Sequence, residues 1–281
     1  MSTGKQIRLN SIFRKETGKT VIIAADHAGI AGPLPGIVDP HALISACVAG
    51  GADGVLTTRG LARAAAGAWD RGTSLILRVT GGFTTLAGKF EEEVISSVEA
   101  ALLYGACGVA VTVKFGHERE GEFIRQASRL ADECERRGMP LLIEAMAQGP
   151  RAAGAPQSAG GPRSAGAAGS GLTVAARAAA EIGADIVKIR YTGDPEGFAE
   201  IVKGCPVPVV IAGGAYTPDI EAVLSEVAGA MSAGAKGIGL GRNVWQERNT
   251  KATVAAMAGI VHERWPVEQA CNYIQQRKKG V

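Results

Sequence analysis

A lysine in a strongly apolar segment is the first residue that could do chemistry. Lys188 lies within Asp185-Ile-Val-Lys-Ile-Arg-Tyr191, with Val and Ile on either side. Burial disfavours the ammonium form and lowers a lysine's pKa, and the neutral amine can attack a carbonyl carbon to form an imine. The segment therefore predicts a Schiff-base lysine. A lysine paired with a buried carboxylate and a lysine on an edge strand are the alternatives that it leaves open.

Other groups that can transfer protons follow similar apolar segments. Asp26 comes directly after the first segment, where its carboxylate can pair with Lys188 or take part in proton transfer. Capping of the following Gly- and Pro-rich loop is the alternative role. His27 beside it is assigned to substrate binding. Lys114 and Glu144 lie near the ends of two later segments, where Lys114 orients Asp26, binds substrate or forms a structural ion pair.

Two glycine-rich turns follow the last two apolar segments. Gly213 and Gly214 end one, and Gly-Leu-Gly241-Arg242 ends the other. Bare backbone N–H groups and a helix N-terminus bind phosphate, and an arginine adds two parallel hydrogen bonds to the same anion. We therefore expect Gly213, Gly214, Gly241 and Arg242 to bind a substrate phosphate. Two ordinary tight turns are the alternative.

Composition excludes several classes of protein and site. The five cysteines are scattered without a CxxC pair, and no HxH, HExxH or carboxylate cluster occurs, so we expect neither a disulfide framework nor a metal site. A net charge of +3 without a dense Lys/Arg stripe argues against nucleic acid. No apolar run reaches the roughly 18 residues that span a bilayer, and the polar N-terminus has no apolar signal segment. We expect a reduced, cytoplasmic protein that does not bind membranes.

Eight short segments rich in Val, Ile and Leu must position these residues. Each is apolar almost throughout, as in strands of a parallel sheet that are buried on both faces. The segments are 20–27, 54–59, 74–80, 108–116, 140–146, 185–191, 207–213 and 237–242.

Helical patterns separate these segments, and several end in a glycine that suits a left-handed helix C-cap. The expected helices cover residues 39–49, 91–104, 120–137, 172–182, 195–202 and 217–233. Eight strands alternating with helices over about 250 residues predict a single-domain α/β fold, the (β/α)8 TIM barrel. A doubly wound sheet is the alternative, but no GxGxxG follows the first strand.

The chain divides into one barrel and peripheral stretches. We assign the barrel to residues 20–270, an N-terminal extension to 1–19 and a C-terminal tail to 271–281. Residues 151–171 are so rich in Gly, Ala and Ser that they cannot bury a core, which predicts a flexible insert after the fifth strand. In a barrel this insert lies at the catalytic face, either as a tolerated insertion or as a lid.

Four motifs together resemble one enzyme superfamily. They are AADHAG (24–29), ADIVKIRY (184–191), CPVPVVIAGG (205–214) and GAKGIGLGRNVWQ (234–246). They are similar to motifs of the class I, Schiff-base aldolases of the archaeal-type fructose-bisphosphate aldolase and deoxyribose-phosphate aldolase superfamily. The resemblance implies a (β/α)8 barrel, an imine at Lys188, proton transfer by Asp26 and homo-oligomers, pentamer-based or decameric. It implies no metal and no cofactor, because the protonated imine is itself the electron sink.

One stretch departs from the family pattern. Typical fructose-bisphosphate aldolases of this type carry Trp-x-Tyr-x-Arg at the end of the fifth strand, with the tyrosine as general acid, whereas residues 144–148 read Glu-Ala-Met-Ala-Gln. Met146 cannot donate a proton, which argues against the usual cleavage of fructose 1,6-bisphosphate. The C-terminal motifs are also similar to a sister branch, the thiolase acting on phosphorylated autoinducer-2, which lacks the tyrosine as well.

These observations favour a metal-independent class I aldolase that acts on a phosphorylated ketose. Lys188 attacks the carbonyl in this interpretation, and Asp26, with Lys114 or Glu144, shuttles protons. One alternative is a thiolase-like or transaldol-type transferase on a phosphorylated dicarbonyl, with coenzyme A as co-substrate of the thiolase. The other is a non-catalytic barrel that binds phosphosugars. Each interpretation predicts a phosphorylated small molecule as the ligand.

Overall fold

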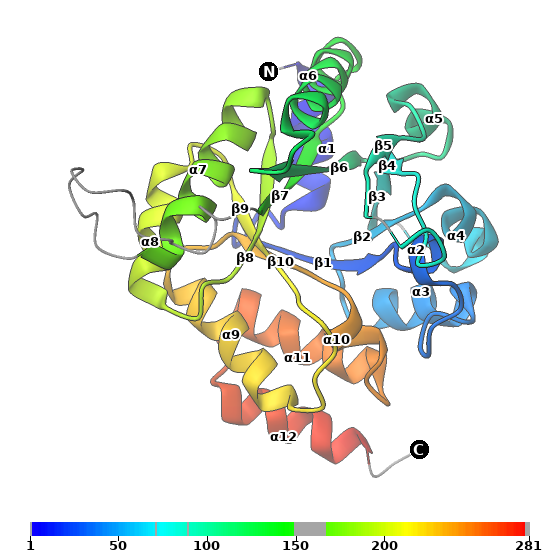
Figure 1. Ribbon diagram of the computed structural model, residues 1–281. Coiled ribbons are helices and arrows are strands. Elements are labelled where there is room, and N and C mark those ends of the chain that lie inside the picture. The colour runs from blue at the N-terminus through cyan, green and yellow to red at the C-terminus, as the bar shows by residue number, and fades with distance from the viewer. Residues whose placement is uncertain (1, 71, 89, 149–166, 279–281) are drawn as a thin grey trace.

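Eight parallel strands close into a barrel in the computed structural model, which describes residues 2–70, 72–88, 90–148 and 167–278 (Figure 1). The strands are β1 Thr20–Ala25, β2 Gly54–Thr57, β3 Ser74–Arg78, β6 Gly108–Phe115, β7 Leu141–Ala147, β8 Ile186–Arg190, β9 Val209–Ala212 and β10 Gly237–Leu240. They follow one another around the barrel in chain order, and β10 pairs with β1, with Thr20 opposite Gly237. This closed parallel sheet confirms the predicted (β/α)8 barrel.

Helices connect the strands and surround the barrel (Figure 1). They are α1 Thr3–Ile12, α2 Ala28–Ala31, α3 Pro40–Ala49, α4 Arg59–Ala64, α5 Val98–Leu103, α6 Glu120–Arg137, α7 Ala167–Ile182, α8 Pro195–Gly204, α9 Ile220–Ser232, α10 Arg242–Trp245, α11 Thr250–Glu263 and α12 Val267–Lys278. A short 3-10 helix, Ala66–Ala68, follows α4. The helix predicted over 120–137 has those bounds, and most of the other predicted helices differ from the structure only by a few residues at their ends.

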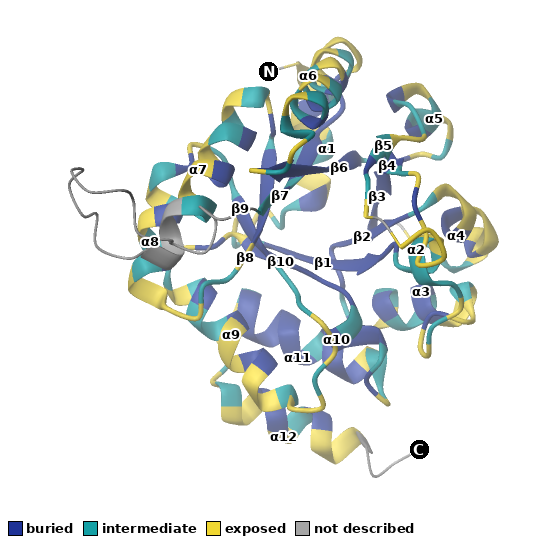
Figure 2. Ribbon diagram, viewed as in Figure 1, coloured by how far each residue is buried: buried dark blue, intermediate teal, exposed yellow. Residues whose placement is uncertain are grey.

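The barrel strands are buried, as Figure 2 shows by their dark blue colour at the centre of the molecule. They are apolar on both faces because one face packs inside the barrel and the other packs against the surrounding helices. Ile22, Leu142, Ile186 and Val210 belong to the inner core, and alternate residues such as Val21 pack under the helices. Successive side chains of a strand point to opposite faces. Residues 188 and 190 of β8 therefore share the inner face with Ile186.

Glycines end the helices that precede five of the strands. Gly51, Gly105, Gly138, Gly183 and Gly234 have φ values between 61° and 116°, a region that costs a residue with a Cβ free energy. Each lets the chain leave a helix and turn back into the sheet. The repeated glycine phrases of the sequence are therefore the connections from helix to strand, as predicted.

The helix predicted over residues 91–104 is wrong in its first half. Strand β5 Glu93–Val94 pairs antiparallel with β4 Thr80–Gly81, and α5 begins only at Val98, where the Ser97 hydroxyl accepts a hydrogen bond from a backbone N–H. The run of three glutamates resembles a solvated helix face, but only Glu91 and Glu93 pair with Arg119 of α6, whereas Glu92 pairs with the buried Arg78. This small hairpin brings Glu92 to the carboxyl end of the barrel.

The two ends of the chain are helical. Helix α1 occupies most of the stretch expected as an N-terminal extension, and α12 covers the start of the expected C-terminal tail. Of the insert expected over 151–171, residues 151–166 lie outside the described residues, and residues 167–171 belong to α7. None of the described helices is long and apolar enough to cross a membrane.

Ion pairs join the amino-terminal end of the barrel to the surrounding helices. The Nζ of Lys5 on α1 lies 2.7 Å from Glu135 and 3.0 Å from Asp185. His262, which the sequence places on the surface of a helix, is a wrong prediction, because its side chain is only 3% exposed and its Nε2 lies 2.8 Å from Asp53. Helix α11 packs against β1 and thereby carries this histidine under the barrel.

Candidate active site

Lys188 lies inside the barrel beside a carboxylate. Its side chain is 5% exposed, and its Nζ lies 2.9 Å from Oε1 of Glu144. The two residues are opposite each other on neighbouring strands β7 and β8. On β10, which only β9 separates from β8, a Cβ on Gly239 would lie 3.1 Å from the Lys188 Cε. The missing side chain of Gly239 therefore gives Lys188 its space.

Arg78 of β3 connects the carboxylates around this lysine. Its guanidinium lies 2.7 Å from Asp26, 2.6 Å from Glu92 and 3.4 Å from Glu144. It also donates a 2.6 Å hydrogen bond to the hydroxyl of Thr112, and that hydroxyl donates to Glu144. The structure thus brings Asp26 and Glu144 to one arginine, so that Asp26 pairs with Arg78 and Glu144 with both Arg78 and Lys188.

Burial and charge act in opposite directions on these carboxylates. Burial alone would raise the pKa of Asp26, but Arg78 and His27 outweigh it, so that pKa lies well below its usual value. The pKa of Glu144 is lowered in the same way by Lys188 and Arg78. For Glu92, burial prevails over Arg78 and the pKa is raised. The site thus combines two ionised carboxylates with a third that protonates more readily.

Lys114 lies on the inner face of β6, two residues beyond Thr112 and therefore nearer the carboxyl end of the barrel. Its Nζ is in contact with the backbone carbonyl of Phe90 and lies 3.6 Å from the centre of that ring. Burial lowers its pKa, which favours the neutral amine. Met146 stands directly opposite it on β7. Lys114 is therefore next to the position where the family pattern has its tyrosine.

The two glycine turns expected to bind phosphate lie side by side. A Cβ on Gly213 would lie 3.7 Å from the backbone nitrogen of Gly241. Asn243 joins the turns by donating to the carbonyl of Ala215 and by accepting from the backbone N–H of Thr217. Helix α10, which starts at Arg242, has only four residues, so the helix N-terminus expected here is a single turn.

Arg242 and His27 complete the mouth of the barrel. The Nε of Arg242 is buried and has no hydrogen-bond partner among the described residues. Nδ1 of His27 lies 3.3 Å from Asp26, and its ring meets the edge of Trp245 at a centroid distance of 6.0 Å. Trp245 is fixed by a 2.9 Å hydrogen bond to the carbonyl of Ala24. His27 thus links the carboxylate of Asp26 to the turn that carries Arg242.

The sequence does not indicate Glu92, Thr112 or Asn243 as members of the site. Glu92 lies within a run of three glutamates that is typical of a solvated surface, and Thr112 is an uncharged residue in an apolar strand. Asn243 directly follows Arg242, which is the more obvious candidate for binding an anion. Thr112 could have been identified from its spacing, because a residue two positions before Lys114 lies on the same face of the strand.

Comparison with known proteins identifies the family. The profile of the DeoC/LacD family aldolases matches residues 20–247. The chain belongs to this family. Among curated relatives of this chain is a 3-hydroxy-5-phosphonooxypentane-2,4-dione thiolase from Klebsiella pneumoniae, 34% identical over 277 residues that cover 99% of this chain and 88% of the relative. Another is the class 1 fructose-bisphosphate aldolase of Thermoproteus tenax, 33% identical, covering 87% of this chain and 90% of the relative.

Solved structures agree with the family assignment. An archaeal fructose 1,6-bisphosphate aldolase matches with a TM-score of 0.78 and 33% identity, over 92% of this chain and 99% of the other. A Schiff-base-forming fructose-1,6-bisphosphate aldolase matches with a TM-score of 0.78 and 34% identity, over 92% and 100%. The barrel and the aldolase family are therefore established together.

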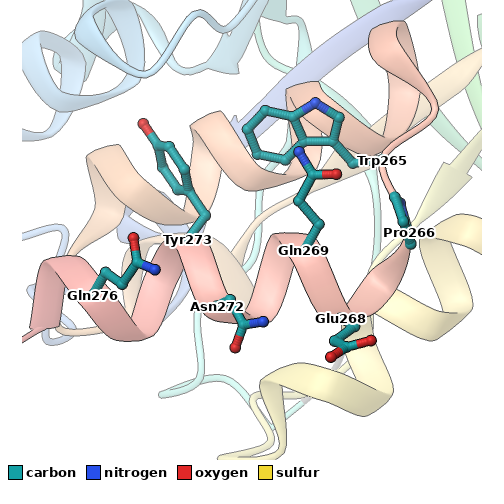
Figure 3. Close-up of a pocket in the computed structure, with 7 residues that line it drawn as sticks. All are labelled: Trp265, Pro266, Glu268, Gln269, Asn272, Tyr273 and Gln276. Atoms are coloured by element: carbon teal, nitrogen blue, oxygen red, sulfur yellow. The ribbon is translucent and has the colours of Figure 1, made fainter.

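Figure 3 shows a surface pocket whose lining residues are distinct from those of the candidate site. It is formed by α12 and the turn before it, and its lining residues are Trp265, Pro266, Glu268, Gln269, Asn272, Tyr273 and Gln276. The rings of Trp265 and Tyr273 lie 5.4 Å apart. None of the residues predicted to do chemistry lines this pocket. In the part of the chain that the structure describes, no three His, Cys, Asp or Glu side chains gather as metal ligands would.

Proposed function

We propose that this protein is a class I aldolase in which Lys188 forms a Schiff base with a phosphorylated ketose and a C–C bond is then cleaved or formed. The observation that carries the proposal is that the Lys188 amine lies buried in the barrel, 2.9 Å from a carboxylate that can take its proton, so that the ion pair left open as an alternative role also serves imine formation. Membership of an aldolase family and the likeness to a Schiff-base-forming enzyme support it. No metal or cofactor takes part in the proposed reaction.

Imine formation requires Lys188 to lose and regain charge. Its ammonium gives a proton to Glu144, and the neutral amine attacks the substrate carbonyl to form a carbinolamine. Glu144 returns the proton to the departing hydroxyl group, which leaves as water, and the iminium ion remains. The ionised state of Glu144 before the reaction suits it to this first transfer, because only the carboxylate can accept the proton.

Cleavage moves electrons from the C–C bond into the iminium ion. The substrate hydroxyl beyond that bond loses its proton, an aldehyde departs, and the enamine at Lys188 is then protonated and hydrolysed. We assign the hydroxyl proton to Lys114, because its pKa is lowered and because it stands opposite Met146, where the family pattern has a tyrosine. Asp26, held ionised by Arg78, stabilises the positive iminium ion.

Borohydride trapping tests this proposal. The protein is incubated with candidate ketose phosphates, reduced with borohydride and weighed by mass spectrometry. We expect a mass gain equal to the reduced substrate adduct in the wild-type protein and in Lys251→Ala, an exposed lysine on α11. Lys188→Ala should gain nothing. An adduct that persists in Lys188→Ala, or no adduct in the wild-type protein, would contradict the proposal.

A thiolase-type transfer is the second candidate, because the curated relative that matches 99% of this chain at 34% identity is a thiolase. Its name specifies a phosphorylated dicarbonyl as the substrate. In this candidate, Lys188 would still bind the carbonyl, and the acyl group would pass to the thiol of coenzyme A. Product formation with and without coenzyme A separates the candidates, since an aldolase needs no thiol acceptor.

A further inference from the structure

Arg190 is a charged residue at the mouth of the barrel that the proposed chemistry does not use. It lies two residues after Lys188 on β8, on the same inner face and nearer the carboxyl end. Its partner in the register is Ala212, the last residue of β9 before Gly213. A Cβ on Gly214 would lie only 3.5 Å from the Arg190 Nη2. The guanidinium of Arg190 therefore lies against the glycine turn.

Arg190 differs from Arg78, the buried arginine of the site, because no described carboxylate pairs with it. Arg78 meets three carboxylates, whereas no ion pair or hydrogen bond joins Arg190 to another described residue. Arg242, on the adjacent turn, has a buried Nε without a partner among the residues that the structure describes. Two guanidinium groups without acidic partners among the described residues thus flank the partly exposed Gly213 and Gly214.

We infer that Arg190 and Arg242 bind the phosphate group of the substrate between them, so that Arg190 sets the preference for phosphorylated over unphosphorylated ketones. Two guanidinium forks and the backbone N–H groups of the glycine turn offer more donors than the two oxygens of a carboxylate can use, and they match the three terminal oxygens of a phosphate. The inference rests on the proposed function and deepens it, because it names the group that recognises the substrate.

The test compares two ketones that differ only in the phosphate. Dihydroxyacetone phosphate and dihydroxyacetone are each trapped by borohydride over a range of concentrations, with the wild-type protein, Arg190→Gln and the control Arg129→Gln, an exposed arginine on α6. In Arg190→Gln we expect the half-saturating concentration of the phosphorylated ketone to rise roughly 10- to 100-fold. The preference for the phosphorylated ketone should fall by the same factor, and Arg190→Lys should restore part of it. Arg129→Gln should behave like the wild-type protein.

A pH series adds a readout that a purely structural role of Arg190 would not change. The second pKa of a phosphate monoester is about 6, so the dianion becomes a monoanion as the pH falls from 7.5 to 5.5. In the wild-type protein we expect the half-saturating concentration of dihydroxyacetone phosphate to rise over this range. The rise should be smaller in Arg190→Gln, because one of the two cations that favour the dianion is gone.

Thermal stabilisation by inorganic phosphate separates failure of this inference from failure of the proposed function, because it requires no imine. Phosphate should raise the Tm of the wild-type protein and of Arg129→Gln, and raise that of Arg190→Gln much less. If no ketone is trapped but this difference holds, the proposed function fails and the role of Arg190 stands. If Arg190→Gln affects both ketones equally or neither, or if phosphate stabilises all three proteins alike, the role of Arg190 is refuted.

Discussion

Arg78 determines the charge of the carboxylates around Lys188. Burial on its own would make Asp26 and Glu144 neutral, because a charged carboxylate is costly away from water. The guanidinium of Arg78 reverses this for Asp26, Lys188 and Arg78 together reverse it for Glu144, and Arg78 also holds the buried Glu92 at 2.6 Å. The protonation states that the proposed mechanism requires thus depend in part on a residue that does not itself react.

Replacing Arg78 should therefore destabilise the whole protein. In Arg78→Met, the buried Asp26 and Glu92 and the partly buried Glu144 lose their shared cation, and breaking a buried pair costs roughly 3–5 kcal/mol. Urea unfolding followed by circular dichroism would measure the loss. Arg59→Met is the matched control, because the one hydrogen bond of Arg59 to another described residue goes to the carbonyl of Ile95. Equal stability of the two variants would contradict this account of Arg78.

Removing the carboxylate of Glu144 should impair turnover more than binding. Glu144→Gln keeps the shape of the side chain but cannot accept the proton of Lys188, so we expect kcat to fall roughly 10²- to 10⁴-fold. The pKa of Glu144 is lowered, so its carboxylate is present at neutral pH and is lost only as the pH falls through this lowered value. The acidic limb of the wild-type kcat profile should reflect that loss, and Glu144→Gln should lack it.

The site residues that could be predicted are those whose type conflicts with their surroundings. Lys188 and Asp26 stand out because a charge in or beside an apolar strand demands an explanation, and the structure places both at the carboxyl end of the barrel. Glu92 could not be predicted, because its burial depends on a hairpin that forms only when β4 and β5 meet. His262 was misassigned because the helix pattern does not reveal what lies beneath it.

Gly239 of strand β10 leaves space for Lys188 because glycine has no side chain. A Cβ on Gly239 would lie 3.1 Å from Cε and 3.2 Å from Cδ of Lys188, closer than nearly all real contacts. The sequence indicates Gly239 only as part of a turn near the phosphate. The residues of other strands that contact a strand residue inside the barrel cannot be predicted from its own segment. The space for the lysine is therefore a property of the closed sheet.

Gly239→Ala should displace Lys188 and slow imine formation while the barrel stays folded. The contacts require Lys188 to shift by a few tenths of an ångström; since a misplacement of about 1 Å costs roughly 100-fold, we expect a loss of up to roughly 10-fold in rate, and overpacking costs about 1–3 kcal/mol of the free energy of unfolding. Single-turnover borohydride trapping and urea unfolding would measure the two effects. Gly204→Ala is the control, since a Cβ there meets nothing within 4 Å, and it should leave the trapping rate unchanged.

The eight barrel strands could be predicted because each is an apolar segment of its own, with a helix pattern and a glycine between neighbours. Strands β4 and β5 have two residues each, and no periodicity reveals an element that short. Their pairing depends on Thr80 meeting Val94 across a connection of more than ten residues. The part of the fold that was missed is thus the part defined by contacts rather than by pattern.

At the scale of the whole molecule, α1 links the beginning of the chain to the amino-terminal end of the barrel. Lys5 pairs with Glu135 on α6 and with Asp185 just before β8. Ile12, at the end of the same helix, belongs to the inner core of the barrel. The stretch predicted only as an extension therefore contributes to the stability of the fold.

Lys5→Met should lower the free energy of unfolding by roughly 1–3 kcal/mol at pH 7, because Asp185 loses its cation but keeps a hydrogen bond from the backbone of Leu141. Burial lowers the pKa of Lys5, but the hydrogen bonds that its ammonium donates to Glu135 and Asp185 outweigh burial and raise the pKa above 10.5. The contribution of Lys5 is therefore complete below about pH 10.5 and is lost as the pH rises through the raised value. Urea midpoints of the two proteins should converge at that pH, and a constant difference would refute the ion pair.

The pairing of β1 with β10 joins residues far apart in the chain, with Thr20 opposite Gly237. During synthesis, the first strand must wait for the last one before the sheet can close, and a contact of such long range forms slowly. Until then, both outer strands of the growing sheet present unpaired backbone groups, which other chains can pair with. A nascent chain that ends before residue 237 should therefore need a chaperone to avoid aggregation. In the full-length chain, the pairing of β1 with β10 leaves no open edge in the barrel sheet.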